Sequence, residues 1–402
     1  MKKYFKYLKG DGVIWVISLI LLAFSLVSVY SFVPILVKME GGTPFRYLFK
    51  HFVYVGIAFS AMFWVHRRNP AYFSKLARFS FFIAIGLLIF TLFFGTKVNG
   101  AGRWIPIPFV GLTFQASDFA KLALILYLAR LLSKKKDLLH SWKEGFWPIM
   151  VPIIVICGLI VKDNFSTAAM VFGISLIILF LGKVPFSKIA SLIGGGILLF
   201  TLVIVIHKAA PEANILPRYE TWENRILNRM DMKTSAPDEI VIVDNAQAKN
   251  AELGIYNGGI FGKGPGRGKV KEYVPEAYAD FFYASYVEEF GLVGAVVLVM
   301  LYLILLYRMI RIALKSDKLF ETYTVLGIGI LLLSQAVVNM MVCTGIAPVT
   351  GQNMPLLAMG GSALIMACVG IGIVQSIAAT QQPAVKEEEE KEEIETENKF
   401  SA

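Results

Sequence analysis

The sequence predicts an all-α, polytopic membrane protein of about ten transmembrane helices, with a large extracytoplasmic loop between helices 7 and 8. Three observations support this fold class. Of the 402 residues, 56% are hydrophobic and 17% are charged, whereas about a quarter of the residues of a soluble protein are charged. Apolar runs of about 18–25 residues, long enough for a helix to cross roughly 30 Å of hydrocarbon, recur along the chain. Basic residues gather in alternate loops between these runs.

Length and hydrophobicity give the order of the predicted spans. They cover residues 12–36, 47–66, 73–95, 114–132, 146–162, 166–182, 187–207, 280–308, 321–343 and 353–379. The N-terminus and the loops after the second, fourth, sixth and eighth spans are rich in Lys and Arg, which makes them cytoplasmic. Both termini are then cytoplasmic, and the long loop at 208–279 faces outward.

The chain divides into three parts, none of them a soluble domain. Residues 1–11 form a cytoplasmic N-terminus, 12–380 the transmembrane domain and 381–402 an acidic cytoplasmic tail. We expect the tail to be disordered, because it is rich in Glu and has no aromatic residue before Phe400. The net charge of +10 does not indicate nucleic-acid binding, since the basic residues lie between spans, where anionic lipid explains them.

Asp280, at the mouth of the eighth span, is the leading candidate for chemistry. It ends the polar loop in the segment Pro-Glu-Ala-Tyr-Ala-Asp-Phe-Phe (275–282). An ionisable side chain at the membrane edge is costly unless it has a use. A helix cap, worth about 0.3–1 kcal/mol, is the simpler interpretation and carries about half of the weight. Glu288 and Glu289 lie about two turns inside the span and suit a lining or structural role.

A glycine-rich stretch at 256–269 carries Lys263, Arg267 and Lys269, and Lys271 follows it as a fourth basic residue. It lacks the GKS or GKT sequence and the strand-then-helix context of a phosphate loop, so we expect no nucleotide site. Two interpretations are equally open. Either the backbone approaches a phosphate or pyrophosphate that the basic residues neutralise, or the stretch is a flexible basic surface near anionic headgroups.

Two further segments hold polar residues near the outer ends of spans. Asp118 and Lys121 are three residues apart on one helix face, as either a structural clamp or part of a site. Arg103, just upstream, is a candidate phosphate ligand at the outer interface. The uncharged last outer loop, 344–355, contains Thr350, and such a backbone is tolerated at membrane depth where it lines a cavity. The Gly-Gly-Ser sequence that follows at 360–362 favours close helix packing.

Taken together, these segments resemble the SEDS family (shape, elongation, division and sporulation), the bacterial peptidoglycan polymerases. The resemblance covers about residues 12–380 and is nearer to the division members, typified by FtsW, than to the elongation members, typified by RodA. Its most specific pieces are Gly-Ala-Gly-Arg-Trp-Ile (100–105), Gln-Ala-Ser-Asp-Phe-Ala-Lys (115–121), Gly-Gly-Ile-Phe-Gly-Lys-Gly (258–264), Val-Pro-Glu-Ala-Tyr-Ala-Asp-Phe (274–281), Glu-Glu-Phe-Gly-Leu-Val-Gly (288–294) and Thr-Gly-Ile-Ala-Pro-Val-Thr-Gly (344–351).

The resemblance implies an enzyme that polymerises lipid II into β-1,4 glycan at the outer face of the cytoplasmic membrane during cell division, releasing undecaprenyl pyrophosphate. It makes Asp280 the catalytic residue, either as a general base or as a ligand of a divalent cation, Mg²⁺ or Mn²⁺. These two roles are left open. The candidate substrate-binding residues are Arg103, Asp118, Lys121, Lys263, Arg267, Lys269, Glu288 and Thr350.

The implied partners are lipid II, the nascent glycan, a class B penicillin-binding transpeptidase and other divisome proteins. The sequence departs from the family pattern at Asp118, where Glu is usual, and at Ala116, where Pro is usual. It also has Asn164 where an Asp is usual, and it lacks the aromatic residues of the last motif, at 355–361. A lipid II flippase or transporter is the main rival function, because charges inside spans suit a translocation path. A purely structural division scaffold is a third.

Overall fold

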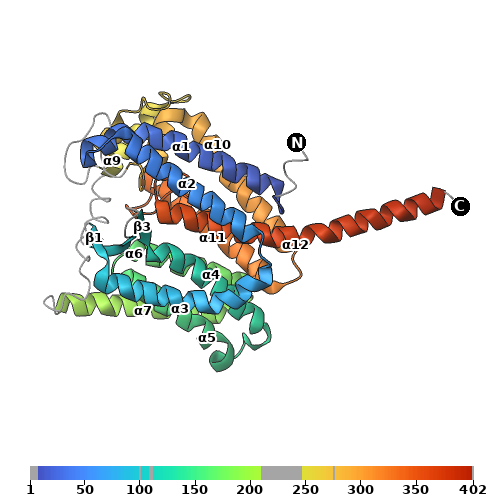
Figure 1. Ribbon diagram of the computed structural model, residues 1–402. Coiled ribbons are helices and arrows are strands. Elements are labelled where there is room, and N and C mark those ends of the chain that lie inside the picture. Colours follow the sequence, from blue (N-terminus) through green and yellow to red (C-terminus); the bar gives the residue numbers. More distant parts are fainter. Residues whose placement is uncertain (1–7, 99–100, 108–111, 210–246, 275–276, 401–402) are drawn as a thin grey trace.

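The computed structural model describes residues 8–98, 101–107, 112–209, 247–274 and 277–400 (Figure 1). Within these ranges, the side chains of 39–40, 97–98, 101–103, 107, 112 and 382–400 lie outside the description. Two parts of the predicted extracytoplasmic loop therefore lie outside the described residues. They are 210–246 and the Pro-Glu pair at 275–276, which precedes Ala277.

Helices correspond one to one to the predicted spans within the described part of the chain. They are α1 (Gly12–Glu40), α2 (Pro44–His66), α3 (Pro70–Phe94), α4 (Ala116–Lys134), α5 (Trp147–Val161), α6 (Phe165–Leu181), α7 (Phe186–Ala209), α10 (Phe282–Leu314), α11 (Leu319–Cys343) and α12 (Gly361–Phe400). Of the described segments, 8 are long and apolar enough to cross a membrane. Neither α4, which carries charged residues along its length, nor the 17-residue α6 is among them. The predicted helical membrane architecture is confirmed.

Short polar residues begin several of these helices, as the sequence chemistry requires. Asp11 Oδ1 accepts hydrogen bonds from the backbone N–H groups of Val13 (2.9 Å) and Ile14 (3.2 Å) at the start of α1. Asn69 caps α3 in the same way, with Pro70 in the first turn. Asn164 accepts a hydrogen bond from the Thr167 N–H at the start of α6. This residue, which stands where the family pattern has an Asp, therefore acts as a helix cap.

A small antiparallel sheet, which the all-α prediction does not include, joins α3 to α4. It consists of β1 (Thr96–Val98), β2 (Ala101–Ile107) and β3 (Leu112–Gln115), in the order β1-β2-β3. Trp104 pairs with Gln115 and Ile105 with Phe114. These side chains favour extended backbone, but a strand forms only where a neighbour pairs with it. The Thr113 N–H donates to the Tyr54 hydroxyl (3.1 Å), which ties the sheet to α2.

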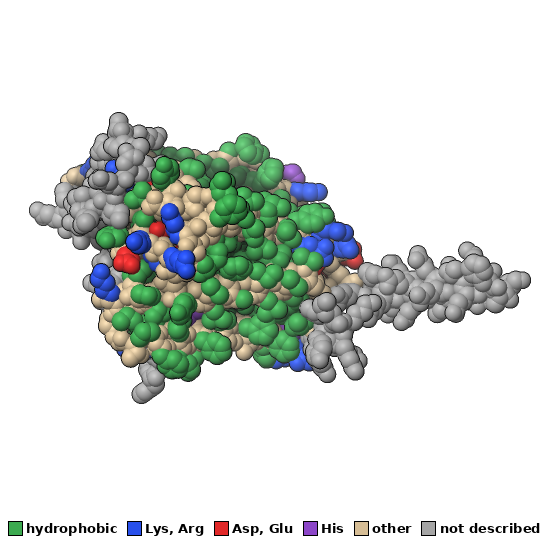
Figure 2. Space-filling model, turned by 90° about the horizontal axis from the view of Figure 1, so that it is seen from above, with side chains coloured by type: hydrophobic (Ala, Val, Ile, Leu, Met, Phe, Trp, Pro, Cys, Tyr) green, Lys and Arg blue, Asp and Glu red, His purple; other side chains and the backbone are tan. Residues whose placement is uncertain are grey.

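The two ends of the bundle differ in what they contain. Figure 1 shows the sheet and α9 (Gln247–Gly258) at one end and the start of α1 at the other. At the second end, Arg308 of α10 pairs with Asp11, and Gln375 of α12 hydrogen-bonds the Asp11 backbone N–H (2.7 Å). Apolar side chains cover the middle of the face in Figure 2, and Lys and Arg gather toward its two ends. This is the surface pattern of a bundle that spans a membrane.

The C-terminal segment leaves the bundle as a continuation of α12 (Figure 1). Gln381 makes the last described side-chain contact, donating to the Ile312 carbonyl (3.0 Å). The sequence predicts disorder for 381–402, whereas the backbone is helical to Phe400. Glu and Lys are good helix formers, and a helix satisfies its own backbone without a core partner, which accounts for the difference.

Candidate functional site

The longest membrane helix, α10, is broken near the end that carries α9. Gly291 has φ 67° and ψ −169°, far from helical values. The carbonyl oxygens of Glu288 and Glu289, freed by this break, accept hydrogen bonds from the N–H groups of Lys263 (2.9 Å) and Gly264 (2.9 Å). On the other side of the break, the Leu292 N–H donates to the Gly259 carbonyl (2.9 Å). The glycine-rich stretch therefore supplies the hydrogen bonds that the broken helix lacks, as a buried backbone requires.

Close backbone contact explains the glycines of this stretch. A methyl group on Gly258 would lie 2.2 Å from the Val287 carbonyl oxygen. One on Gly262, which has φ +79°, would lie 2.2 Å from the Glu289 carbonyl oxygen. The stretch is thus fixed to α10 by its backbone.

The cations that the sequence singles out on this stretch remain at the surface. The side chains of Lys263, Arg267 and Lys269 are all exposed. Because the backbone alone makes the contacts with α10, these three charges stay available to an anion in the surrounding water.

Glu288 and Glu289 hold the same stretch from inside. Glu288, 2% exposed, accepts hydrogen bonds through Oε1 from the N–H groups of Lys269 (2.8 Å) and Val270 (3.0 Å). Glu289 pairs with buried Lys271 at 2.5 Å, and the Lys271 ammonium also donates to the Ser31 carbonyl (3.0 Å) of α1. Both carboxylates thus make contacts within the chain that fit a structural role, and the substrate-binding role of Glu288 stays a prediction.

Asp280 lies in the turn 277–281, immediately before α10 begins. The span is predicted to begin at residue 280, but the helix begins two residues later, at Phe282, and its N-cap residue is Phe281. Asp280 is therefore not the N-cap residue of α10. Asp280 is partly buried. Its Oδ2 lies 3.4 Å from where a methyl group would stand on Gly351, whose φ is +68°. The carboxylate therefore lies over the loop 344–355, at the residue that follows partly buried Thr350.

A buried amide joins this turn to the same loop. Asn339 of α11 donates through Nδ2 to the carbonyl oxygens of Asp280 (2.9 Å) and Gln352 (2.8 Å). Its Oδ1 accepts a hydrogen bond from the Tyr283 N–H (3.3 Å). The Gln352 amide in turn donates to the Thr167 hydroxyl (2.6 Å) of α6. Sequence reasoning missed Asn339, for which the available signal was an uncharged amide within an apolar run, and it did not single out Gln352 within the loop 344–355.

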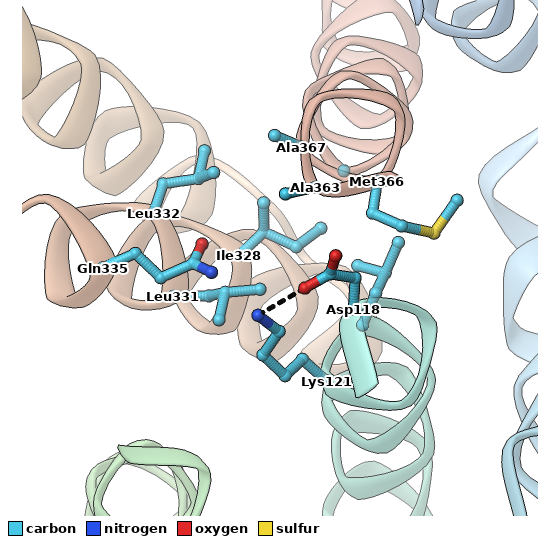
Figure 3. Close-up of a pocket in the computed structure, with 11 residues that line it drawn as sticks. Asp118, Lys121, Ile328, Leu331, Leu332, Gln335, Ala363, Met366 and Ala367 are labelled. Atoms are coloured by element: carbon cyan, nitrogen blue, oxygen red, sulfur yellow. Dashed lines mark ion pairs between the residues drawn. The ribbon is translucent and has the colours of Figure 1, made fainter. Parts of the chain in front are cut away.

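Asp118 and Lys121 form a second, enclosed cluster (Figure 3). They pair at 2.8 Å and are 5% and 6% exposed. The Ser362 hydroxyl donates to Asp118 Oδ2 (2.8 Å). Figure 3 shows both charged side chains reaching from α4 toward α11, where Gln335 lies. With side chains of α11 and α12 they line a cavity of about 20 Å³, room for a single water molecule.

The Gly-Gly-Ser sequence contributes to both packing and this cluster. A methyl group on Gly361 would lie 2.0 Å from the Tyr54 ring, as the close-packing prediction requires. Ser362, which the same prediction included, instead hydrogen-bonds Asp118.

Comparison with known proteins identifies the family. The chain matches the family model for FtsW, RodA and SpoVE, described as "Cell cycle protein", over residues 11–383. The chain belongs to the SEDS family. A relative from Trichlorobacter lovleyi, named "Probable peptidoglycan glycosyltransferase FtsW", is 30% identical over 385 residues, which are 94% of this chain and 96% of that protein.

Solved structures of SEDS proteins have the same fold. One chain, from a structure described as "Structural coordination of polymerization and crosslinking by a peptidoglycan synthase complex", has a TM-score of 0.69 at 24% identity, covering 92% of this chain and 98% of that chain. RodA of Thermus thermophilus has a TM-score of 0.62 at 22% identity, covering 92% of this chain and 96% of that chain.

The SEDS motifs thus lie in distinct places in the structure. Asp280 lies over Gly351 in the loop 344–355, and the Asp118–Lys121 pair meets Ser362, a few residues after that loop. Glu288 binds the backbone at Lys269 and Val270, at the end of the glycine-rich stretch. Arg103 lies on β2, and its side chain is outside the described residues.

Proposed function

We propose that this chain is a peptidoglycan glycosyltransferase that polymerises lipid II into β-1,4 glycan at the outer membrane face during cell division, releasing undecaprenyl pyrophosphate. The observation that carries the proposal is the partly buried Asp280, whose carboxylate lies over Gly351 at the end of the bundle away from Asp11. The glycosyltransferase names of the relatives support the reaction class, and their FtsW names support the division role.

The reaction requires a proton acceptor beside the attacking hydroxyl. In our proposal Asp280 takes the proton of the acceptor sugar's 4-hydroxyl as that oxygen attacks the anomeric carbon of the donor. The bond from that carbon to the pyrophosphate oxygen breaks, and the electron pair leaves with the pyrophosphate. One attack from the opposite face converts an α-linked donor into a β-linked product. General base catalysis of this kind contributes about 10²–10⁴-fold in rate.

The leaving pyrophosphate needs positive charge nearby. We assign this role to the exposed side chains of Lys263, Arg267 and Lys269, together with Arg103 of β2. Lys121 is buried and paired with Asp118, so its charge is already compensated and it serves the fold of the site.

A divalent cation is the alternative use of Asp280. Among the described residues, no group of three or more His, Cys, Asp or Glu side chains is close enough to hold a metal ion. Mg²⁺ is often held by one or two carboxylates with water and substrate phosphates, so Asp280 fits as one ligand of a site that the pyrophosphate completes. The cation would supply charge neutralisation at the leaving group. Loss of polymerisation in EDTA and its recovery with Mg²⁺ or Mn²⁺ would favour this role over the general base.

The proposed partners follow from a chain that would polymerise glycan. A class B penicillin-binding transpeptidase would crosslink the product, and other divisome proteins would direct both enzymes to the division site. The likeness in fold to a chain of a synthase complex described as coordinating polymerization and crosslinking supports this pairing.

The deciding experiment compares wild type with Asp280→Ala, each purified with its cognate transpeptidase and supplied with lipid II. We expect long glycan from wild type and none from the folded variant. Equal polymer from both would move the catalytic role to another residue. Movement of labelled lipid II across vesicles without polymer would favour the flippase, and neither activity would favour the scaffold.

A further inference from the structure

We infer that Asn339 is a positioning residue for Asp280, setting the carboxylate over the last outer loop by holding the backbone of both segments. This inference rests on the proposed catalytic role of Asp280. Asn339 lies on α11, 59 residues from Asp280 in sequence, and its side chain is 0% exposed. None of the sequence motifs contains it.

The chemistry of the Asn339 amide matches the groups around it. An Asn side chain has two N–H donors and one carbonyl acceptor. Here both donors go to backbone carbonyls, those of Asp280 and Gln352, and the acceptor takes the Tyr283 N–H. Asp in this position has no donor for either carbonyl, and Ala or Leu has no polar group at all.

The two carbonyls that Asn339 binds belong to the turn before α10 and to the loop 344–355, the two segments between which the Asp280 carboxylate lies. Asp280 carries the proposed base, and Gln352 directly follows Gly351, the residue beneath that base. One side chain thus fixes the distance between the carboxylate and the surface it lies over. Because Asn339 binds the Asp280 backbone, it sets the position of this residue without occupying the carboxylate.

A second buried amide, that of Gln352, extends the hydrogen bonds made by Asn339. Gln352, itself buried, donates to the Thr167 hydroxyl near the start of α6 at 2.6 Å. The Met359 N–H also donates to the Tyr278 carbonyl (3.0 Å), so the far part of the loop is joined to the same turn. The arrangement links α6, α11, the turn before α10 and the loop before α12. A shift of about 1 Å in such a group can reduce a catalytic rate by about 10²-fold.

The test measures steady-state lipid II polymerisation by Asn339→Ala and Asn339→Asp in complex with the transpeptidase. We expect kcat to fall about 10- to 100-fold and KM to stay within about twofold, since the exposed cations are untouched. The milder Asn339→Ser keeps one donor and should retain more activity than Asn339→Ala.

Gln375→Glu is the matched control. Gln375 is also 0% exposed and also joins backbone groups, donating to the Asp11 carbonyl (2.8 Å) and accepting from the Asp11 N–H, but at the other end of the bundle. The Gln375→Glu variant should lower the melting temperature as much as Asn339→Asp does and should leave kcat per folded molecule unchanged.

The remaining outcomes oppose the inference. Unchanged kcat per folded molecule in the Asn339 variants, a raised KM with normal kcat, or failure of all three variants to fold would each make the residue structural or substrate-binding. If Asp280→Ala itself retains full activity, the proposed function fails first. If Asp280→Ala is inactive and Asn339→Ala is normal, only the positioning role fails.

Discussion

Asp118 and Asp280 are both acidic residues at the starts of membrane helices, yet the structure holds them in opposite ways. Asp118 is buried and bound through its carboxylate, by Lys121 on one oxygen and Ser362 on the other. Asp280 is partly buried, and Asn339 holds it through its backbone carbonyl.

The difference shows how a membrane protein separates structural acids from chemical ones. A carboxylate whose oxygens are bound by a cation and a hydroxyl has its contacts within the protein and is held in its place. A residue that is held by its backbone can present its side chain to a substrate. The residues that position the second kind of acid lie far away in sequence.

The largest expected effect separates the two acids by activity. Asp280→Asn keeps the size of the side chain and removes its basicity, so we expect a loss of about 10²–10⁴-fold in kcat with the protein still folded. Asp118→Asn should act mainly through stability, with kcat per folded molecule much less affected. Lipid II polymerisation normalised to folded protein measures both. Equal losses of kcat in both variants would end the distinction between the two acids.

The next effect concerns the buried pair. Lys121→Met leaves the Asp118 carboxylate buried without its cation, which should cost about 3–5 kcal/mol of stability. The double variant Asp118→Leu with Lys121→Met removes both charges and should recover most of that loss. The melting temperatures of the wild type, the single variant and the double variant, measured in detergent, test this expectation. A double variant no more stable than the single one would show that the ion pair is not what stabilises this region.

The glycine-rich stretch offers a third test, of backbone-held structure alone. Gly262→Ala forces a side chain into a left-handed conformation and against the Glu289 carbonyl, so we expect a loss of about 1–3 kcal/mol. Faster proteolysis within 258–274 should accompany it. Gly194→Ala in α7, where a methyl group meets nothing within 4 Å, is the control and should leave both readouts near wild type. Similar proteolysis of the two variants would contradict the interlock with α10.

The smallest effect on stability belongs to the exposed cations. Lys263→Ala and Lys269→Ala should change stability by no more than about 0.5 kcal/mol. If these residues attract the pyrophosphate, KM for lipid II should rise severalfold at low salt, and the difference should shrink at high salt. Lys75→Ala, an exposed cation on α3, should leave KM unchanged. A KM unaffected by both loop variants would remove these residues from the substrate site.

The sequence by itself determined the membrane architecture, because the features involved are local. A helix must be long and apolar enough to cross the bilayer, and each of these properties is read from a continuous run of residues. The pairing of Asp118 with Lys121 was equally accessible, since residues three apart share a helix face. The choice of Asp280 as the leading catalytic candidate also rested on a local feature, since it is an acidic residue at the edge of a membrane span.

Only the tertiary structure decided what each of these residues contacts. At the break at Gly291, backbone groups of the glycine-rich stretch hydrogen-bond those of α10, and Lys271 pairs with Glu289. No local sequence pattern specifies how these two segments align. The sheet of 96–115 depends on strands that pair across turns. Asn339 reaches Asp280 across 59 residues because α11 packs beside α10. Hydrogen bonds between distant segments depend on how the helices pack, and packing is a property of the whole chain.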